Sequence, residues 1–296
     1  WRTEMALPTI AYHRPATLAD ACTLGVQCGA DGAFLAGGTE LLPDYHRGRE
    51  GARQLIALEG VEELHGVRVE AGTLWIGALP TVAEVARSTL VREWCPALAE
   101  AAGAVGSPPI RSLATIGGNF CRAVPCADTP PPAIVSRARL DLLGPAGPRE
   151  VGAEAFFVGP RQTVLLPGEL LIGIRIPRPE SQFGASYQRF ARRRGSALAV
   201  AAVAAGVGFV EGRIVGARIA LGAVAPIPLL ATRAAAVLEG EAPSDELFAV
   251  AGATSAEEAL PISDLRGSAA FRRELVAVLT RRALYEATSR AGIQLP

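Results

Sequence analysis

Hydrophobic and polar positions along the chain follow two periods, which predict helices and strands in mixed order. Near the start, apolar residues recur at intervals of three and four behind a capping-box-like Thr17 and Asp20, so we expect a helix over about 17–29. An uninterrupted apolar run over 33–36 predicts a strand that leads directly into a glycine pair.

The middle of the chain predicts a hairpin and further helices. The hairpin covers 67–78 and turns at Ala71 and Gly72. Thr81 and Glu84 form a second capping box, which opens a helix at about 82–88. The other elements expected in this part are a strand at 53–58, a helix at 93–105, a helix at 133–138, a strand at 139–143 and a strand at 170–176.

The last part of the chain has a different pattern, in which two long apolar strands precede three helices. The strands are expected at 197–209 and 213–223, joined around Glu211 and Gly212, and the helices at 229–238, 244–259 and 268–289. The inner face of the last helix is expected to consist of Phe271, Leu275, Val278, Leu279 and Leu284. This pattern predicts an α+β module without chemistry of its own, separated from the first part at the proline-rich segment 176–180.

Two glycine-rich segments are candidates for chemistry: 35–40, directly after a predicted strand, and 114–119, within a long helix-poor segment over 106–132. Glycine allows positive φ, and consecutive main-chain N–H groups form a nest that suits phosphate. Two facing turns, each with a threonine hydroxyl, could therefore hold both charges of a pyrophosphate. The alternative is ordinary Gly-Gly turns, which a chain with 32 glycines is expected to contain. Neither segment matches the Rossmann or P-loop pattern.

Two polar residues in the long segment have open interpretations. Asn119 is the only asparagine of the chain, which favours a functional position, although asparagine also tolerates a left-handed turn. Asp128 could accept hydrogen bonds from sugar hydroxyls, or it could form an Asx turn before three prolines.

Composition and charge exclude several classes of protein. The formal net charge is zero, so no basic footprint indicates nucleic acid or an anionic membrane. No apolar run approaches the roughly 20 residues that span a bilayer, and the N-terminal segment lacks the apolar region of a secretory signal. All 29 basic residues are arginine, which excludes lysine-dependent sites such as a P-loop or a Schiff base. Met5 is the only methionine and is expected to be the natural start.

Histidine and cysteine give little support to a metal centre or a nucleophilic enzyme. The three histidines lack metal-ligand spacing, and no hydrolase motif is present. The five cysteines form no C-x-x-C pair and, without a secretion signal, are interpreted as reduced cytosolic thiols. Cys121 and Cys126 are too few for a four-cysteine iron–sulfur cluster and are expected to be ordinary loop thiols.

Longer stretches of the chain resemble the FAD-binding medium subunits of the xanthine dehydrogenase and carbon monoxide dehydrogenase family, the molybdenum hydroxylases. The two flavin-binding signatures are matched by AGGTELLP (36–43) and by ATIGGNFCRAVPCADTPPPAIVSRARLDLLG (114–144). Further segments that resemble this family occur in the same order along nearly the whole chain: AYHRPATLADA, IGALPTVAEVA, GSPPIRSLATIGGN, LLIGIRIP, FARRRGSALAV and GAVAPIPLLA.

The resemblance implies an α+β fold with two domains. A vanillyl-alcohol-oxidase-type FAD-binding domain is expected over 1–178, with subdomains of about 1–58 and 59–178. A smaller α+β C-terminal domain of the molybdenum hydroxylase flavoprotein type is expected over 179–296.

The resemblance also implies a cofactor site for FAD, with no catalytic side chain and no metal ligand. Two sets of residues would hold the diphosphate, and they are Leu35, Ala36, Gly37, Gly38, Thr39 and Glu40 on one side and Thr115, Gly117, Gly118 and Asn119 on the other. Asp128 would bind the polar chain of the cofactor, Val105 and Gly106 would line the adenine end, and Leu171 would stack near the isoalloxazine ring. Arg189 takes the place of a lysine near the flavin in many relatives.

Arg189 also belongs to the densest charge run of the chain, with Arg192, Arg193 and Arg194. The usual interpretation of such a run is a solvated face. The alternatives are partial contact with flavin or a docking surface for a partner protein.

The implied function is an electron relay within a complex. A large subunit with molybdenum–pterin would oxidise the substrate, and a small subunit with two [2Fe–2S] clusters would pass electrons to FAD and on to an external acceptor. The complex is expected to be a cytoplasmic dimer of heterotrimers, a heterohexamer that can associate with the inner face of the membrane. One branch of the family inserts a cysteine-rich loop for a [4Fe–4S] cluster after GGN. Asp128 follows Asn119 here by only nine positions, so we expect no cluster in this subunit.

Two other functions stay open from the sequence. A free-standing flavin oxidase of the same superfamily would need a substrate base or a covalent flavin attachment. A non-enzymatic nucleotide-binding or assembly protein would take up no FAD.

Overall fold

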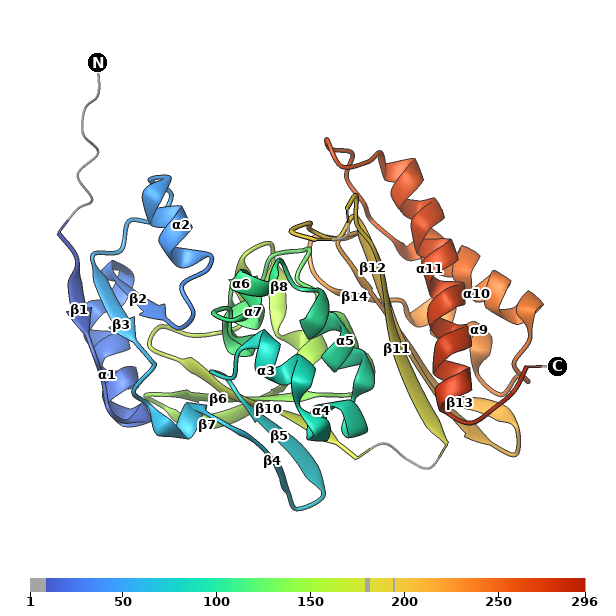
Figure 1. Cartoon of the computed structure of the whole chain (residues 1–296), viewed down its shortest axis with the longest axis horizontal. Coiled ribbons are helices and arrows are strands. Elements are labelled where there is room, and N and C mark those ends of the chain that lie inside the picture. The colour runs from blue at the N-terminus through green and yellow to red at the C-terminus, as the bar shows by residue number, and fades with distance from the viewer. Residues whose placement is uncertain (1–8, 179–181, 194, 296) are drawn as a thin grey trace.

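The computed structural model describes residues 9–178, 182–193 and 195–295 and contains three main sheets with helices packed on them. Figure 1 shows these sheets one after another along the longest axis of the molecule. Three predictions of the sequence involve positions outside the described residues: Met5 as the start, Arg194 in the arginine run, and part of the boundary segment 176–180.

The first sheet is parallel, in the order β1-β3-β2, and lies at the N-terminal end. Its strands are β1 (Ala11–His13), β2 (Gly32–Leu35) and β3 (Gln54–Ala57). Helix α1 (Leu18–Cys28) packs beside them and begins at Thr17, whose hydroxyl accepts a hydrogen bond from the Asp20 amide. The predicted helix and both predicted strands are confirmed, and β2 does lead directly into the glycine pair.

The second sheet is antiparallel, in the order β4-β5-β10-β6-β7. Its strands are β4 (Val67–Glu70), β5 (Thr73–Gly77), β6 (Arg139–Gly144), β7 (Gly147–Gly152) and β10 (Leu170–Pro177). The predicted hairpin turns at Ala71 and Gly72, both of which have positive φ. Strand β7 and the small β8–β9 hairpin (Phe157–Gly159 and Gln162–Thr163) were not predicted.

Helices α3 (Val82–Arg87), α4 (Thr89–Trp94) and α5 (Pro96–Ala104) follow the hairpin. The capping box at Thr81 and Glu84 is confirmed in both directions. The single helix predicted over 93–105 is wrong, because Cys95 leaves the helical conformation with φ −148° and ψ 70°. Pro96 explains the break, since proline disfavours the α conformation in the residue before it and suits the first turn of the next helix.

The segment 106–132, predicted to be a helix-poor loop, contains short helices instead. These are α6 (Pro108–Arg111), α7 (Ile116–Cys121) and the start of α8 (Pro130–Val135). Helix α8 begins three residues before the predicted 133–138, because prolines in a first helical turn lack only N–H groups that would have no helical partner.

The third sheet is antiparallel, with the order β11-β12-β13-β14, and is made of β11 (Phe183–Phe190), β12 (Ala201–Val210), β13 (Arg213–Gly222) and β14 (Leu229–Leu230). Helices α9 (Thr232–Leu238), α10 (Asp245–Glu258) and α11 (Ala269–Arg290) form a layer on one face, while α5 and α8 contact the other (Figure 1). Strand β12 is therefore buried on both faces, which explains its alanines and glycines. The sequence missed β11 and β14, so residues 229–231 are not helical as predicted.

Helix α11 buries a face that only partly matches the predicted one, since Leu279 and Leu284 are buried as expected. Phe271 and Val278 are 38% and 45% exposed, whereas Val276, Ala283 and the charged Arg272 are buried. The guanidinium of Arg272 is accommodated because it donates to the carbonyls of Val200 and Ala223 and pairs with Asp264. The inner face thus keeps two of the predicted leucines and adds alanines, threonines and one arginine, which hydrophobicity alone would not select.

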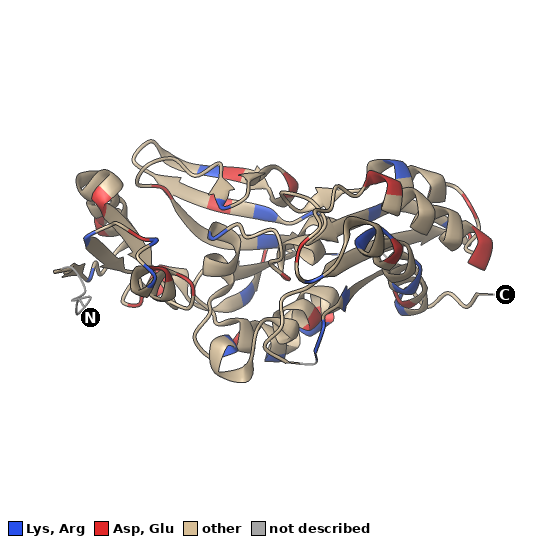
Figure 2. Cartoon of the chain, turned by 90° about the horizontal axis from the view of Figure 1, so that it is seen from above, with Lys and Arg blue, Asp and Glu red and all other residues tan. Residues whose placement is uncertain are grey.

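Helices and strands occupy separate layers, as expected for the α+β class. Basic and acidic side chains are interspersed along all three sheets and their helices (Figure 2). Within the described ranges, no helix is both long enough and apolar enough to cross a membrane.

Candidate functional site

A cavity of about 520 Å³ lies where the two glycine-rich segments meet. The first segment joins β2 to α2 (Leu41–His46), and the second surrounds the start of α7. The loop at 105–107, the residues that follow α7 up to Asp128, and the segment 196–198 also contribute to the lining. The tertiary structure therefore brings together two turns that are nearly eighty residues apart in the chain.

Most of the residues singled out from the sequence line this cavity. They are Ala36, Gly37, Gly38, Thr39, Glu40, Val105, Gly106, Thr115, Gly118, Asn119 and Asp128. Four others do not line it: Leu35, Gly117, Leu171 and Arg189. Leu35 is paired with Ala57 inside the first sheet, and Leu171 is a buried residue of β10.

The first segment presents unpaired main-chain donors. Gly38 has φ +67°, which reverses the chain and lets its carbonyl accept from the Leu42 amide at the start of α2. The N–H groups of Gly37, Gly38, Thr39 and Glu40 donate to no acceptor among the described residues. Consecutive N–H groups of this kind form an anion nest.

Gly37 explains how the two segments come so close. A Cβ atom at this position would collide with the carbonyl of Leu113, just before the second segment. Only glycine permits that approach of one main chain to the other.

The second segment differs from the predicted clamp, because its main-chain amides are already occupied. Ile116 donates to Pro80 O at 3.0 Å, Gly117 to Ala78 O at 2.9 Å, and Gly118 to the Thr115 hydroxyl at 3.1 Å. This segment contributes unfilled space beside the cavity rather than hydrogen-bond donors. A Cβ atom on Gly118 would meet only the Thr115 Oγ1, at 2.9 Å, so its flank toward the cavity is empty. Gly117, by contrast, is required by its packing against Ala78.

Asn119 is not a left-handed turn residue, since it lies within α7 and lacks positive φ. Its Oδ1 accepts a hydrogen bond of 2.6 Å from the Thr129 hydroxyl. With its oxygen fixed by Thr129, the amide nitrogen remains available as a donor at the cavity wall.

Asp128 is buried, with 5% of its surface exposed, and its carboxylate has two partners inside the protein. The Tyr187 hydroxyl donates to Oδ1 at 2.7 Å, and Arg189 donates to both oxygens at 2.9 and 3.0 Å. Burial raises the pKa of Asp128, and the positive charge of Arg189 opposes that rise.

Arg189 is therefore not a solvated residue, although it belongs to the arginine run. Its side chain is 14% exposed and also donates to the carbonyls of Ala104 and Ala197. Arg192 and Arg193 are exposed, as the usual interpretation of a charge run predicts. Arg189 thus contacts the cavity only through its partners: Asp128 lines the cavity and Arg189 pairs with it without lining the cavity itself.

Both cysteines of the long segment line the cavity. Burial raises the pKa of the Cys121 thiol to about 12, so this group stays protonated and is a poor nucleophile at neutral pH. Burial also raises the pKa of Cys126. In the part of the chain that the structure describes, no cluster of three or more histidine, cysteine or acidic side chains could hold a metal ion.

The sequence did not single out Asp44 and Arg122, which form an ion pair at this site. Asp44 lies on α2 and is 2% exposed, and Arg122 caps the C-terminal end of α7 and lines the cavity. The one available signal was that Arg122 follows Asn119 by three residues, which places both on the same side of a helix.

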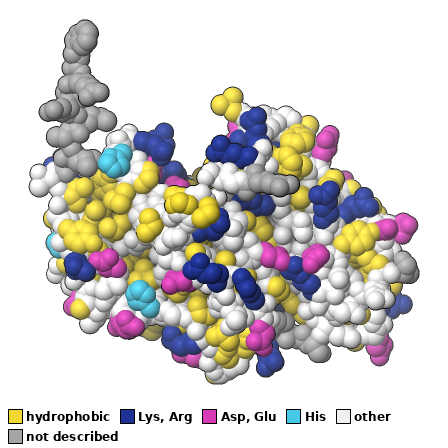
Figure 3. Space-filling view, viewed as in Figure 1, with side chains coloured by type: hydrophobic (Ala, Val, Ile, Leu, Met, Phe, Trp, Pro, Cys, Tyr) yellow, Lys and Arg dark blue, Asp and Glu magenta, His cyan; other side chains and the backbone are white. Residues whose placement is uncertain are grey.

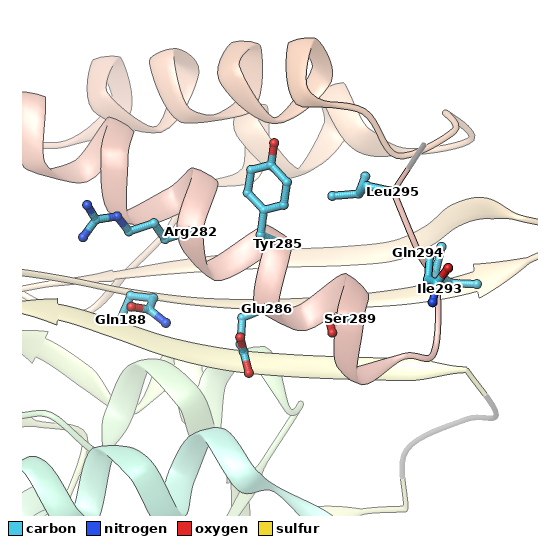
Figure 4. Close-up of a pocket in the computed structure, with 8 residues that line it drawn as sticks. All are labelled: Gln188, Arg282, Tyr285, Glu286, Ser289, Ile293, Gln294 and Leu295. Carbon is cyan, nitrogen blue, oxygen red and sulfur yellow. The ribbon is translucent and has the colours of Figure 1, made fainter.

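A second hollow, of about 700 Å³, lies at the C-terminal end of α11. Figure 4 shows Arg282, Tyr285, Glu286 and Ser289 along this helix, with Leu295 of the C-terminal segment nearby. None of the residues predicted to bind a cofactor lines it. On the face drawn in Figure 3, apolar side chains gather mainly on the left, and charged side chains are spread over the rest. The cavity between the glycine-rich segments is thus the better candidate.

Comparison with known proteins identifies two family models in the chain. Residues 8–179 match a model described as FAD binding domain in molybdopterin dehydrogenase, and residues 185–287 match the CO dehydrogenase flavoprotein C-terminal domain. Together these matches include nearly all of the described residues.

Individual relatives agree with the family models over almost their full length. The chain is 35% identical to the carbon monoxide dehydrogenase medium chain of Afipia carboxidovorans, covering 95% of this chain and 97% of the relative. It is 29% identical to a xanthine dehydrogenase FAD-binding subunit of Escherichia coli, covering 96% and 98%. A solved carbon monoxide dehydrogenase from Hydrogenophaga pseudoflava superposes with a TM-score of 0.93 at 34% identity, covering 97% of this chain and 99% of that chain. The predicted α+β fold with a flavin-binding domain is confirmed by these matches.

Proposed function

The chain belongs to the FAD-binding medium subunits of the molybdenum hydroxylases, and from this premise we propose that it relays electrons from iron–sulfur clusters of a partner to an external acceptor. The partners are a small subunit with two [2Fe–2S] clusters and a large subunit with molybdenum–pterin. Three kinds of subunit, each present twice, make up the complex. Bound FAD supplies a carrier that accepts electrons singly and releases them singly or in pairs.

The observation that carries this proposal is the meeting of the two glycine-rich segments at one cavity. The free N–H groups of 37–40 suit a phosphate oxygen, and the empty flank of Gly118 leaves space for a diphosphate beside them. The residues present therefore fit a dinucleotide, although the two segments contribute differently.

We assign the cofactor-binding residues accordingly. Gly37 to Glu40 donate main-chain hydrogen bonds to the diphosphate. Gly118 provides room, and Asn119 adds a side-chain donor. Val105 and Gly106 line the adenine end. Leu35, Gly117, Leu171 and Arg189 act from behind the cavity wall by holding these residues in place.

The domain division that we propose is 1–178 for FAD binding, with subdomains of about 1–58 and 59–178, and 179–296 for the C-terminal domain. The grouping of strands into sheets supports this division. Strands β1 to β3 form the first sheet, the second sheet takes its strands from 67–177, and β11 to β14 form the third. We place the complex in the cytoplasm, which the five free cysteines support.

The side chains at the cavity favour a relay over a free-standing oxidase. Cys121 is protonated, and Asp128 is occupied by Tyr187 and Arg189, so neither is poised to take a proton from a substrate. The chemistry then requires only that the chain binds FAD, orients it and limits its contact with water.

Two experiments test the proposal. Affinity capture of the native chain, followed by mass spectrometry and metal analysis, should recover two partner polypeptides together with molybdenum and iron. Acid or heat denaturation should release free FAD. Flavin that stays attached to the denatured chain would instead indicate the oxidase, and a colourless protein that takes up no FAD would contradict any flavin function.

A further inference from the structure

Arg122 and Asp44 form an ion pair beside the cavity, and the two residues follow different glycine-rich segments. Arg122 extends from the C-terminal end of α7, and Asp44 lies in the first helix after the Gly37–Gly38 turn. Their side chains form an ion pair, and the exposed fractions are 24% for Arg122 and 2% for Asp44. The ion pair holds the guanidinium of Arg122 at the lining of the cavity.

Positive charge is in excess around Asp44. Arg161 donates to the same carboxylate at 2.9 Å, and Arg47 lies 4.0 Å from it. Glu40 is a second carboxylate, 3.9 Å from the Nε atom of Arg122. Three guanidinium groups thus face two carboxylates, which leaves one positive charge for a further anion.

Arg122 is the member of this cluster that a ligand in the cavity can reach. Arg161 and Arg47 are 46% and 60% exposed on the outside and do not line the cavity. The side chain of Arg122 is 24% exposed and lines the cavity, although its Nε atom is itself buried without a hydrogen-bond acceptor in the described parts of the chain. A guanidinium whose donors are not all paired is stabilised by an anion, and the exposed part of Arg122 is where an anion in the cavity would bind.

The other charged groups of the lining cannot attract an anion. Glu40, Glu50 and Asp128 are acidic. Glu50 accepts from the amides of Gly51 and Ala52, and Asp128 is paired with Arg189. Among the described residues that line the cavity, Arg122 is the sole basic side chain.

We propose that Arg122 is the cation that recognises the diphosphate of the bound dinucleotide, and that Asp44 is the positioning residue that orients its guanidinium. The inference rests on the proposed function and adds a charged contact to the free amides of 37–40. A guanidinium is always charged and can donate two parallel hydrogen bonds to phosphate oxygens. Because the chain has no lysine, Arg122 would supply the positive charge that a lysine ammonium group supplies in other phosphate-binding sites.

The test compares ligands with and without a diphosphate. Flavin-free protein is titrated with FAD, ADP and adenosine for the unmodified chain and for Arg122→Gln, Arg161→Gln and Arg282→Gln. Arg161→Gln is the matched control because it removes another partner of Asp44 from outside the cavity. Arg282→Gln removes an arginine from the hollow of Figure 4.

Arg122→Gln should weaken ADP and FAD binding by about tenfold to a hundredfold, as expected for a hydrogen bond to a charged group, and leave adenosine unchanged. Its ADP affinity should also depend less on salt than that of the unmodified chain. Both controls should bind ADP as the unmodified chain does.

Three results would overturn the inference: unchanged ADP binding in Arg122→Gln, an equal loss of ADP and adenosine, or a loss of ADP binding in Arg161→Gln as large as that in Arg122→Gln. An unmodified chain that binds neither FAD nor ADP would contradict the proposed function itself. Should Arg122→Gln fail to fold, arginine-specific labelling of the unmodified chain gives the answer. ADP, but not adenosine, should then protect Arg122, and equal labelling with either ligand would refute the contact.

Discussion

The Tyr187 hydroxyl donates a hydrogen bond of 2.7 Å to the buried carboxylate of Asp128. Tyr187 lies in the middle of β11, and Asp128 lies just before α8, at the lining of the cavity. Burial and the nearby Asp128 raise the pKa of Tyr187 well above 10, so the phenol is protonated and can donate at neutral pH. The bond therefore joins the third sheet to the cofactor site.

Replacing this phenol should loosen the site without removing any group from the cavity. We expect Tyr187→Phe to lower the free energy of unfolding by about 1–3 kcal/mol, because a buried carboxylate loses one donor. Urea denaturation measures this change. Tyr12→Phe, at a tyrosine that is 52% exposed, should change stability by less than about 0.5 kcal/mol. Equal effects of the two changes would contradict the role of the bond.

Arg189 cannot be exchanged freely for a lysine. Arg189 donates to Asp128 and to the carbonyls of Ala104 and Ala197, which lie in different segments. A lysine ammonium can pair with Asp128 but cannot span all three acceptors with a planar fork. We expect Arg189→Lys to cost about 1–2 kcal/mol and Arg189→Ala about 3–5 kcal/mol, since alanine leaves Asp128 buried without a cation.

Thermal unfolding at neutral pH measures both changes at Arg189, and retained FAD shows whether the cavity has changed. Arg193→Lys, at an exposed member of the same run, is the control. If Arg189→Ala were no less stable than Arg189→Lys, the ion pair with Asp128 would contribute nothing to stability.

Gly118 should be required for the cofactor rather than for the fold. A valine at this position places its side chain in the empty flank of the cavity and disturbs only the Thr115 cap, at a cost of about 1 kcal/mol. We expect Gly118→Val to lose most of its FAD, as measured by flavin absorbance after gel filtration, with a small change in melting temperature. Gly103→Val, at an exposed helical glycine with ordinary contacts, should keep its FAD.

Gly38→Val should lower both FAD content and stability. Gly38 has φ +67°, which is strained for a β-branched residue, and a Cβ atom there would lie 2.9 Å from the Leu42 side chain. The turn would then no longer present its N–H groups together. Full flavin loading in both Gly38→Val and Gly118→Val would refute the binding site.

Glu169 gives a prediction for the dependence of stability on pH. Hydrogen bonds from Arg149, at 2.6 and 2.7 Å, lower the pKa of Glu169 below 4.5, and the Leu166 amide adds to the effect against the cost of burial. Because the folded pKa is lowered, the stabilisation is complete above the ordinary value and is lost as pH falls through the lowered one. We expect Glu169→Gln to cost about 2 kcal/mol at neutral pH and progressively less below pH 4.5.

Denaturant unfolding at several pH values measures this difference. Glu150→Gln, at an exposed pair with Arg139, should cost less than about 1 kcal/mol at any pH. A cost of Glu169→Gln that stays constant between neutral and acid pH would show that the charge of Glu169 is not what stabilises the fold.

Features that depend only on neighbouring residues could be predicted from the order of the amino acids. Four helices begin with a side-chain cap that accepts from the amide three residues ahead, and the capping residues are Thr17, Thr81, Ser244 and Ser268. Both partners of each bond lie within four consecutive residues, so the bond can be predicted from the local sequence. The hairpin at 67–78 is local in the same way, and so is the glycine turn after β2. These features, together with the family signatures, were enough to place both glycine-rich segments and to predict the class of fold.

The way in which the two glycine-rich segments form the cavity depends on contacts between remote parts of the chain. The amides of the second segment are occupied by the carbonyls of Ala78 and Pro80, which come from the β5–α3 connection. Asp44 and Arg122, which lie on the separate helices α2 and α7, meet in an ion pair beside the cavity. A periodic pattern of hydrophobic residues records which face of an element is buried, but it holds no information about which remote donor, acceptor or charge lies against that face. That choice is made when the three sheets pack together.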